Sequence, residues 1–194
     1  MLILAINTCQ AACNGAIIRC GESGQTAILA DATEQMRRGQ DGRLPGFVSD
    51  LCDEANADLA QVDRIAVVTG PGSFTGIRIG IAFARGLALA LEKPIVGLTS
   101  LEAGTNLHGE QLVALPAQVR PPDRTFWVQS LMDGLGTGQV REIPEAKLKE
   151  SELILSSPSA LIAALKARLI EPSSHPAKPV YARAPDAALP KSSR

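Results

Sequence analysis

Aromatic residues are scarce in this chain, since Phe, Trp and Tyr make up 3% of its 194 residues. A surface that binds single-stranded nucleic acid by stacking needs several exposed rings, so this class of protein is disfavoured. A strong charge is also missing, because 19 Lys and Arg are balanced by 20 Asp and Glu, for a formal net charge of -1. No global field therefore draws the chain to RNA or to a membrane, and any contact with RNA would be local or shared with another chain.

Metal-binding spacings are absent as well. The two histidines, His108 and His175, are far apart, and no two of the four cysteines have the two-residue gap of a zinc or redox motif. We expect reduced, buried or half-buried cysteines and no metal held by this chain. The first apolar run, LILAI, is short and has no basic leader, which predicts neither a signal peptide nor a membrane span and favours a cytoplasmic location.

The hydrophobic pattern predicts an α/β protein. Short β-rich runs and helical periodicities follow one another in the order β-β-β-α-β-α-β, at residues 2–8, 16–20, 25–33, 44–57, 65–69, 76–92 and 94–99. Pro45 suits the first turn of the first helix. This order is that of a ribonuclease-H-like lobe.

The pattern is weaker in the second half of the chain. It predicts a short helix near Ser100, strands at 112–117 and 125–133, and a final helix capped by Ser157 or Ser159. That helix would bury one face, formed by Leu161, Ala164, Leu165 and Leu169. We expect an N-terminal lobe at 1–101, a smaller second lobe at 102–184 and a flexible tail at 185–194.

The segment GPGSFTGIRIG, residues 70–80, joins a predicted strand to a predicted helix. Its glycines are spaced G-x-G-x-x-x-G, which does not fit the dinucleotide fingerprint, and the loop lacks the lysine of a P-loop. Two interpretations remain. Backbone N–H groups and hydroxyls at the helix start could bind an anion, or the glycines could only make a tight turn that Ser73 or Thr75 caps.

The helix after this loop is rich in Gly and Ala. Gly80 and Gly86 inside a helix each cost about 0.5 to 1 kcal/mol relative to Ala, so close approach by another backbone would compensate. Arg78 and Arg85 share a face with Ala82 and Leu89, which suits a partner helix carrying carboxylates. Equally, both arginines could be solvated and the glycines could pack on the chain's own sheet.

Several segments carry a family resemblance: ILAINT, RRGQDGRLPGFVSDL, GPGSFTGIRIGIAFARGLALA, PIVGLTSLEA and PVYARAPDA. In these segments the chain resembles the TsaB (YeaZ) family. The similarity is dense over residues 1 to about 103 and returns over residues 179–187. The resemblance implies the actin/Hsp70/sugar-kinase superfold, with two ribonuclease-H-like lobes of which the second is reduced.

The resemblance also implies a function. Such proteins are non-catalytic accessory subunits in the synthesis of N6-threonylcarbamoyladenosine (t6A) at position 37 of tRNAs that read ANN codons. They pair with the catalytic paralogue TsaD, a TsaE ATPase docks on that pair, and they form homodimers when alone. Metal and ATP are expected to bind to the partner subunits. Contact with tRNA is expected only through the complex, and this chain is expected to hold no tightly bound cofactor.

The resemblance places the partner interface on the two N-lobe helices. The expected interface residues are Leu44, Phe47, Val48, Leu51, Gly76, Arg78, Gly80, Ala82, Phe83, Arg85, Gly86 and Leu89. Weak nucleotide or anion binding is the minority hypothesis, and its residues are Asn7, Thr8, Gly70, Gly72, Ser73 and Thr75.

The chain departs from the family pattern at three places. Asn7 stands where the family usually has Asp, and an amide lacks the negative charge that Mg²⁺ prefers. Gln40 stands where His is common, and PAQVRPPDRTFWVQ replaces a family strand turn in the second half. The alternatives are a stand-alone ATP-binding enzyme and an M22-type peptidase-like protein, although no Ser-His-Asp or HExxH pattern is present.

Overall fold

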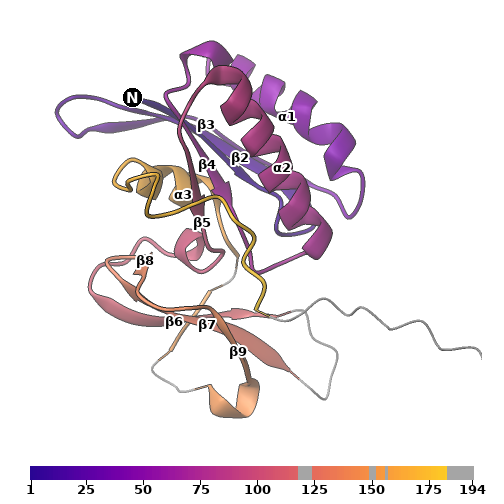
Figure 1. Ribbon diagram of the computed structural model, residues 1–194, viewed down its shortest axis with the longest axis vertical. Helices are drawn as coiled ribbons and strands as arrows, with labels where there is room; N and C mark the ends of the chain where they lie inside the picture. The colour runs from indigo at the N-terminus through magenta and orange to yellow at the C-terminus, as the bar shows by residue number, and fades with distance from the viewer. Residues whose placement is uncertain (118–123, 149–151, 156, 183–194) are drawn as a thin grey trace, which may run out of the picture.

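The structure is a computed structural model that describes residues 1–117, 124–148, 152–155 and 157–182. It contains two β-sheets, one above the other, with three α-helices around the upper sheet (Figure 1). The strands are β1 Leu2–Asn7, β2 Ala12–Cys20, β3 Thr26–Gln35, β4 Arg64–Val68, β5 Ile95–Leu98, β6 Glu110–Pro116, β7 Thr125–Met132, β8 Leu135–Gly136, β9 Arg141–Pro144 and β10 Leu153–Ile154. The helices are α1 Gln40–Glu54, α2 Phe74–Leu91 and α3 Ala160–Ala167.

The upper sheet has the strand order β3-β2-β1-β4-β5. The first three strands form an antiparallel meander, and β4 and β5 run parallel to β1. The strand β1 is buried along its whole length, because helices cover both faces of the sheet at its centre. The predicted β-β-β-α-β-α-β order and the α/β, ribonuclease-H-like fold class are confirmed.

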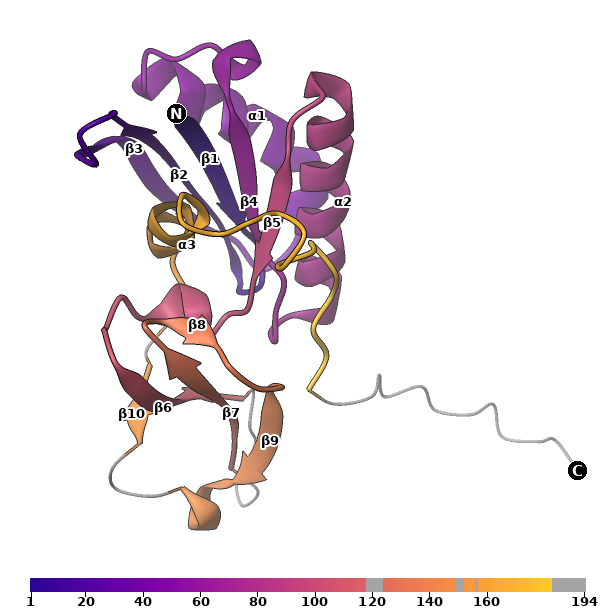
Figure 2. The same cartoon turned by 60° about the vertical axis from the view of Figure 1, so that its left-hand side comes forward.

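Helices α1 and α2 lie on one face of this sheet and α3 lies on the other (Figure 2). The helix α3 contacts β1, β2 and β4, although we predicted its residues as part of the second lobe. Its buried face consists of Ala160, Ala163, Ala164, Lys166 and Ala167. Of the predicted face, Ala164 is buried and Leu161 and Leu165 are half-buried against the core. Leu169 was wrong, since it lies beyond the end of the helix and is 73% exposed.

One helix start differs from the prediction, and another matches one of its two alternatives. The helix α1 begins at Gln40, four residues early, after Gly39 with φ 83°, so Pro45 lies inside the helix rather than in its first turn. Ser159 caps α3, accepting hydrogen bonds from Leu161 and Ile162 N–H, which settles the choice between the two serines.

The lower sheet has the order β10-β6-β7-β8, with β9 also paired to β7. The predicted strands near 112–117 and 125–133 are confirmed as β6 and β7, whereas β8, β9 and β10 are too short for the hydrophobic pattern to show.

The four cysteines are free; Cys9, Cys13 and Cys52 are buried and Cys20 is half-buried, as expected. The predicted tail at 185–194 lies outside the described residues.

Candidate functional site

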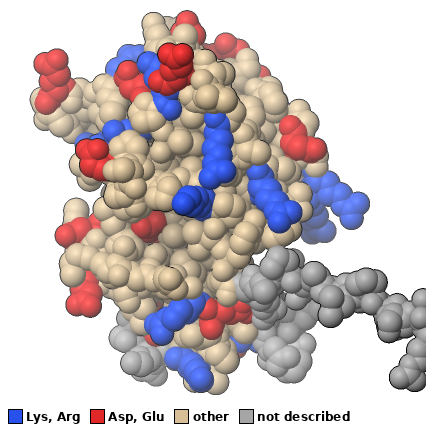
Figure 3. All heavy atoms as spheres, in the orientation of Figure 1, with Lys and Arg blue, Asp and Glu red and all other residues tan. Residues whose placement is uncertain are grey.

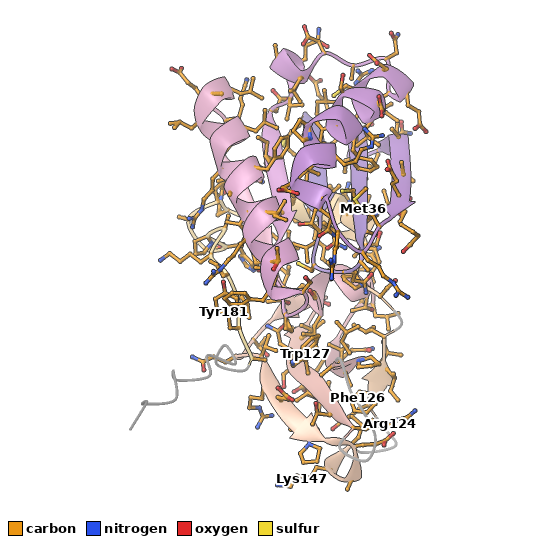
Figure 4. All side chains as sticks on the ribbon, turned by 90° about the vertical axis from the view of Figure 1, so that its right-hand side faces the viewer. Met36, Arg124, Phe126, Trp127, Lys147 and Tyr181 are labelled. Carbon is orange, nitrogen blue, oxygen red and sulfur yellow. The ribbon has the colours of Figure 1, made fainter. Side chains whose placement is uncertain are left out.

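A cleft of about 850 Å³ lies between the two sheets. The strands β1, β4 and β5 are parallel, so their carboxyl ends meet at one edge of the upper sheet, where α/β proteins usually bind ligands. The upper wall comes from the β1–β2 turn, the glycine loop, Arg37 and Gln40. The lower wall includes Trp127, which lies on the second sheet below the ends of α1 and α2 (Figure 4), and Glu142.

Asn7 ends β1 but does not serve this cleft. It is 2% exposed, its Nδ2 donates to the carbonyl of Pro158 at 3.1 Å, and its Oδ1 accepts from Cys9 N–H at 3.0 Å. Both ends of the amide are therefore used to join β1 to the chain before α3. The expectation that Asn7 contacts a nucleotide is corrected: this amide has a structural role.

Thr8 is also removed from the candidate ligand-binding set. Its side chain is fully buried, and Oγ1 donates to the carbonyl of Gly76 at 2.6 Å. The glycine loop lies directly on this part of β1: a Cβ at Gly76 would be 2.0 Å from the Thr8 carbonyl oxygen, and one at Gly72 would be 2.3 Å from that of Cys9. Real Cβ atoms do not come so close to backbone, so these two positions require glycine.

The rest of the loop is held in the same way. Ser73 N–H donates to the Cys9 carbonyl at 2.7 Å, and Ser73 Oγ accepts from Gly76 N–H at 3.2 Å, which caps α2. Gly70, with φ 100°, is buried against Ile77 and the carbonyl of Val180. The loop therefore docks the start of α2 onto β1, in agreement with the structural interpretation. Of the predicted nucleotide-binding residues, Gly72 and Ser73 line the cleft, and Thr75 is exposed.

The cleft combines Arg37, Gln40, Ser73, Glu142 and the indole of Trp127. Gln40 Nε2 donates to the carbonyls of Gln10 and Ala12, each at 2.8 Å, so the residue at the family's usual histidine position braces the β1–β2 turn. Within the described ranges no three His, Cys, Asp or Glu side chains lie close enough to hold a metal ion. Weak nucleotide binding stays a hypothesis about the cleft.

The predicted interface residues fall into two sets. Leu44, Phe47, Val48 and Leu51 are at most 4% exposed and pack α1 on its own sheet; Gly76 and Gly80 are buried against Thr8. These six offer no side-chain surface to a partner, because the amphipathic stripe that predicted the helix also buries it. The remaining α2 residues lie on its outer face: Arg78, Ala82, Arg85, Gly86 and Leu89 are exposed, and Phe83 is half-buried.

This outer face is apolar and cationic. Leu89 is 81% exposed, and a Cβ at Gly86 would meet no atom within 4 Å. Lys and Arg side chains gather over the lower half of α2 (Figure 3). By length and composition α2 could cross a membrane, but core helices of soluble proteins pass the same test and α2 packs against β4. Eight of its 18 residues are exposed, among them Phe74 and Leu89, so part of this apolar helix is open to solvent.

A second polar cluster joins the two sheets behind the cleft. The Glu102 carboxylate is 3% exposed and accepts from Thr99 N–H at 2.6 Å and from Gly136 N–H at 2.7 Å; His175 Nε2 lies 3.5 Å away. Lys166, on α3, donates to the carbonyls of Glu102 and Gly134. We call Glu102, Lys166 and His175 the interlobe clasp. The hydrogen bond with Glu102 raises the pKa of His175, whereas burial lowers the pKa of Lys166 to about 8.

The raised pKa of His175 predicts a pH-dependent stability. Its contribution should be complete below the unfolded pKa of about 6.5 and lost as the pH rises through the higher folded pKa. We expect His175→Gln to lose about 1 kcal/mol of unfolding free energy at pH 6 and less at pH 8 in urea titrations. His108→Gln is the control, because the side chain of His108 is 93% exposed. An equal loss from His175→Gln at both pH values would contradict the assignment.

Sequence reasoning missed the lower wall of the cleft and this clasp. The strand of Trp127 was predicted, but nothing in the sequence placed this side chain in a cleft, and the strand of Glu142 was not predicted. The clasp joins residues 64 positions apart in sequence, which no local pattern brings together. A usable signal was Lys166 itself, a single lysine among the alanines and leucines of ALIAALKA.

Comparisons with known proteins agree with this architecture. A family model described as TsaD, tRNA N6-adenosine threonylcarbamoyltransferase, matches residues 32–116. The Escherichia coli tRNA threonylcarbamoyladenosine biosynthesis protein TsaB is 37% identical over 101 residues, 52% of this chain and 41% of that protein. The Haemophilus influenzae TsaB is 34% identical over 119 residues, 59% of this chain and 48% of that protein. YeaZ from Pseudomonas aeruginosa superposes with a TM-score of 0.70 at 25% identity, covering 93% of this chain and 99% of that one.

The chain is similar to the TsaB/YeaZ family in sequence and in fold. It spans about half the length of the curated TsaB relatives that it matches. The match to the YeaZ structure extends over both sheets, so the TsaB/YeaZ fold includes the divergent second half. The TsaD family model covers α1, β4, α2 and β5, and thus includes the apolar and cationic face of α2.

Proposed function

We propose that this chain is a non-catalytic subunit of a complex that forms t6A in tRNA. In this proposal it pairs through the outer face of α2 with a TsaD-type catalytic subunit, and a TsaE-type ATPase joins the pair. The complex transfers threonylcarbamoyl to N6 of adenosine 37 in tRNAs reading ANN codons, in the cytoplasm. Relatives that are 34 to 37% identical are named as tRNA threonylcarbamoyladenosine biosynthesis proteins, which supports a role in this pathway.

The proposed pairing rests on the exposed apolar and cationic face of α2. Eight of the 18 residues of this apolar helix are exposed, although its inner face is docked with close glycine contacts. Among the described residues no carboxylate forms an ion pair with Arg78 or Arg85, so neither cation on this face is neutralised by an acid of the described chain. A second apolar helix would cover such a surface, and the small side chains of Ala82 and Gly86 would allow close packing.

The test is the mass of the complex after mixing with the TsaD-type subunit from the same cell. We expect a one-to-one heterodimer by light scattering after size exclusion, and Ala82→Glu should abolish it, because an unpaired carboxylate would be buried in the interface. Thr75→Glu is the control: Thr75 is exposed at the start of α2, where a carboxylate is tolerated. Failure of the wild-type chain to form any mixed species at micromolar concentration would refute the proposal.

The chain alone is proposed to form a homodimer through a related surface. Helix α1 carries the exposed carboxylates Asp41, Asp50, Asp53 and Glu54, which could face the arginines of α2 in a second copy. Homodimer and heterodimer would then compete for one face, and adding the catalytic subunit should reduce the homodimer in the same light-scattering experiment.

A further inference from the structure

Three side chains form a stack at the N-terminal end of α2. The guanidinium carbon of Arg78 lies 3.8 Å above the centre of the Phe74 ring. The rings of Phe74 and Tyr181 are 5.2 Å apart, and Arg78 Nε donates to Tyr181 OH at 3.3 Å. Figure 4 shows Tyr181 beside this end of the helix. Phe74 is 36% and Tyr181 40% exposed, so the stack lies at the surface of a chain that has few aromatic residues.

The backbone before Tyr181 fixes its position. The segment 175–181 returns from α3 and crosses the ends of β4 and β5. Val180 N–H donates to the Thr69 carbonyl, and the His175 carbonyl accepts from Gly97 N–H, each at 2.8 Å. Tyr181 follows Val180 directly, so the upper sheet determines where this ring stands and, through it, where the guanidinium of Arg78 stands.

The stack leaves part of Arg78 available for binding. Only its Nε is bonded to Tyr181, and the described chain supplies no carboxylate to either terminal nitrogen. A guanidinium held over a ring has already lost side-chain freedom, so it binds a carboxylate at a smaller entropic cost. The residues of α2 include no Asp or Glu, so the acid must come from outside the helix.

We propose that Arg78, positioned by Phe74 and Tyr181, anchors the α2 face to a carboxylate on an apolar helix of the partner subunit. This inference rests on the proposed function, and it adds Tyr181, which lies outside α2, to the interface. Arg85 lies two helical turns beyond Arg78, about 10.5 Å along the axis. The partner helix therefore carries two Asp or Glu side chains seven residues apart, with small or apolar residues between them to meet Ala82.

A helix fits this surface better than a phosphate backbone does. The surface between and beyond the two arginines is apolar, with Phe83 half-buried and Leu89 81% exposed. An RNA backbone would satisfy the cations but leave this apolar surface in water, whereas a helix with apolar residues between its acids would cover both.

The test measures the affinity of the full chain for the TsaD-type subunit by calorimetry. We expect Arg78→Gln to weaken binding about 10- to 100-fold and to reduce its salt dependence, because a charge-assisted pair is lost. Arg78→Lys keeps the charge but not the planar fork, and should recover only part of the affinity. Tyr181→Ala should weaken binding about 5- to 10-fold and Tyr181→Phe about 2- to 3-fold, since phenylalanine keeps the ring contact.

Lys178→Gln is the matched control, because Lys178 is an exposed cation on the same segment and lies outside the stack; its affinity should change less than twofold. Wild-type affinity in both Arg78→Gln and Tyr181→Ala, while Ala82→Glu blocks pairing, would overturn the anchor and leave the proposed function standing. A loss confined to the homodimer or to tRNA binding would overturn it too. If the wild-type chain does not bind the subunit at all, the proposed function fails with it.

Discussion

Gly76→Ala is expected to lower the free energy of unfolding by about 3 kcal/mol or more. The added Cβ would lie 2.0 Å from the Thr8 carbonyl oxygen, and this buried backbone atom directly after β1 cannot move aside as a flexible side chain can. Relief requires α2 to shift away from β1, which would also break the Thr8–Gly76 and Ser73–Cys9 hydrogen bonds. Urea denaturation of the purified variant measures the loss.

Gly86→Ala on the same helix is the matched control. A Cβ at Gly86 meets nothing within 4 Å, so the substitution should raise the free energy of unfolding by about 0.5 to 1 kcal/mol through helix propensity. Opposite signs for two Gly→Ala changes ten residues apart would show that the glycine loop serves packing against β1. Equal and small effects at both positions would contradict the close approach of α2 to β1.

Lys166→Met should cost about 3 kcal/mol of stability and loosen the contact between the two sheets. Methionine fills a similar volume, but it leaves the carbonyls of Glu102 and Gly134 without their donor and the Glu102 carboxylate with one cation fewer. We expect a lower urea midpoint and faster proteolysis of the second half than in the wild-type chain.

Lys178→Met tests whether the loss of any lysine has this effect, since Lys178 is exposed. Its free energy of unfolding should stay within about 0.5 kcal/mol of the wild-type value. If Lys166→Met is as stable as Lys178→Met, the clasp does not hold the sheets together.

The first half of the fold was predictable because its signals are local. Alternating or continuous apolar runs mark β1 to β5, and the glycine loop with Ser73 marks the start of α2. Sequence alone could also predict that the glycines of α2 need close backbone contact. It could not show which part of the protein each glycine contacts. In the structure Gly76 and Gly80 pack against Thr8, whereas Gly86 is exposed.

The errors have a common physical cause. The apolar stripe of α1 predicted a helix correctly, but a stripe does not say whether the covering surface belongs to the same chain, and here it does. The α3 face was wrong only at Leu169, because the helix ends at Ala167 and its most deeply buried positions are alanines that let it approach the sheet closely. The Arg78–Tyr181 contact joins residues 103 positions apart and was beyond any local pattern.

The position of α3 has a consequence for synthesis on the ribosome. The face of the upper sheet formed by β1, β2 and β4 is covered only when residues 160–167 have emerged, although all five strands are complete by Leu98. A growing chain therefore holds a paired sheet with one bare apolar face while roughly 60 more residues are added, which at about 5 to 20 residues per second takes about 3 to 12 seconds. Nascent chains of this protein are thus expected to be clients of ribosome-associated chaperones until α3 closes the sheet.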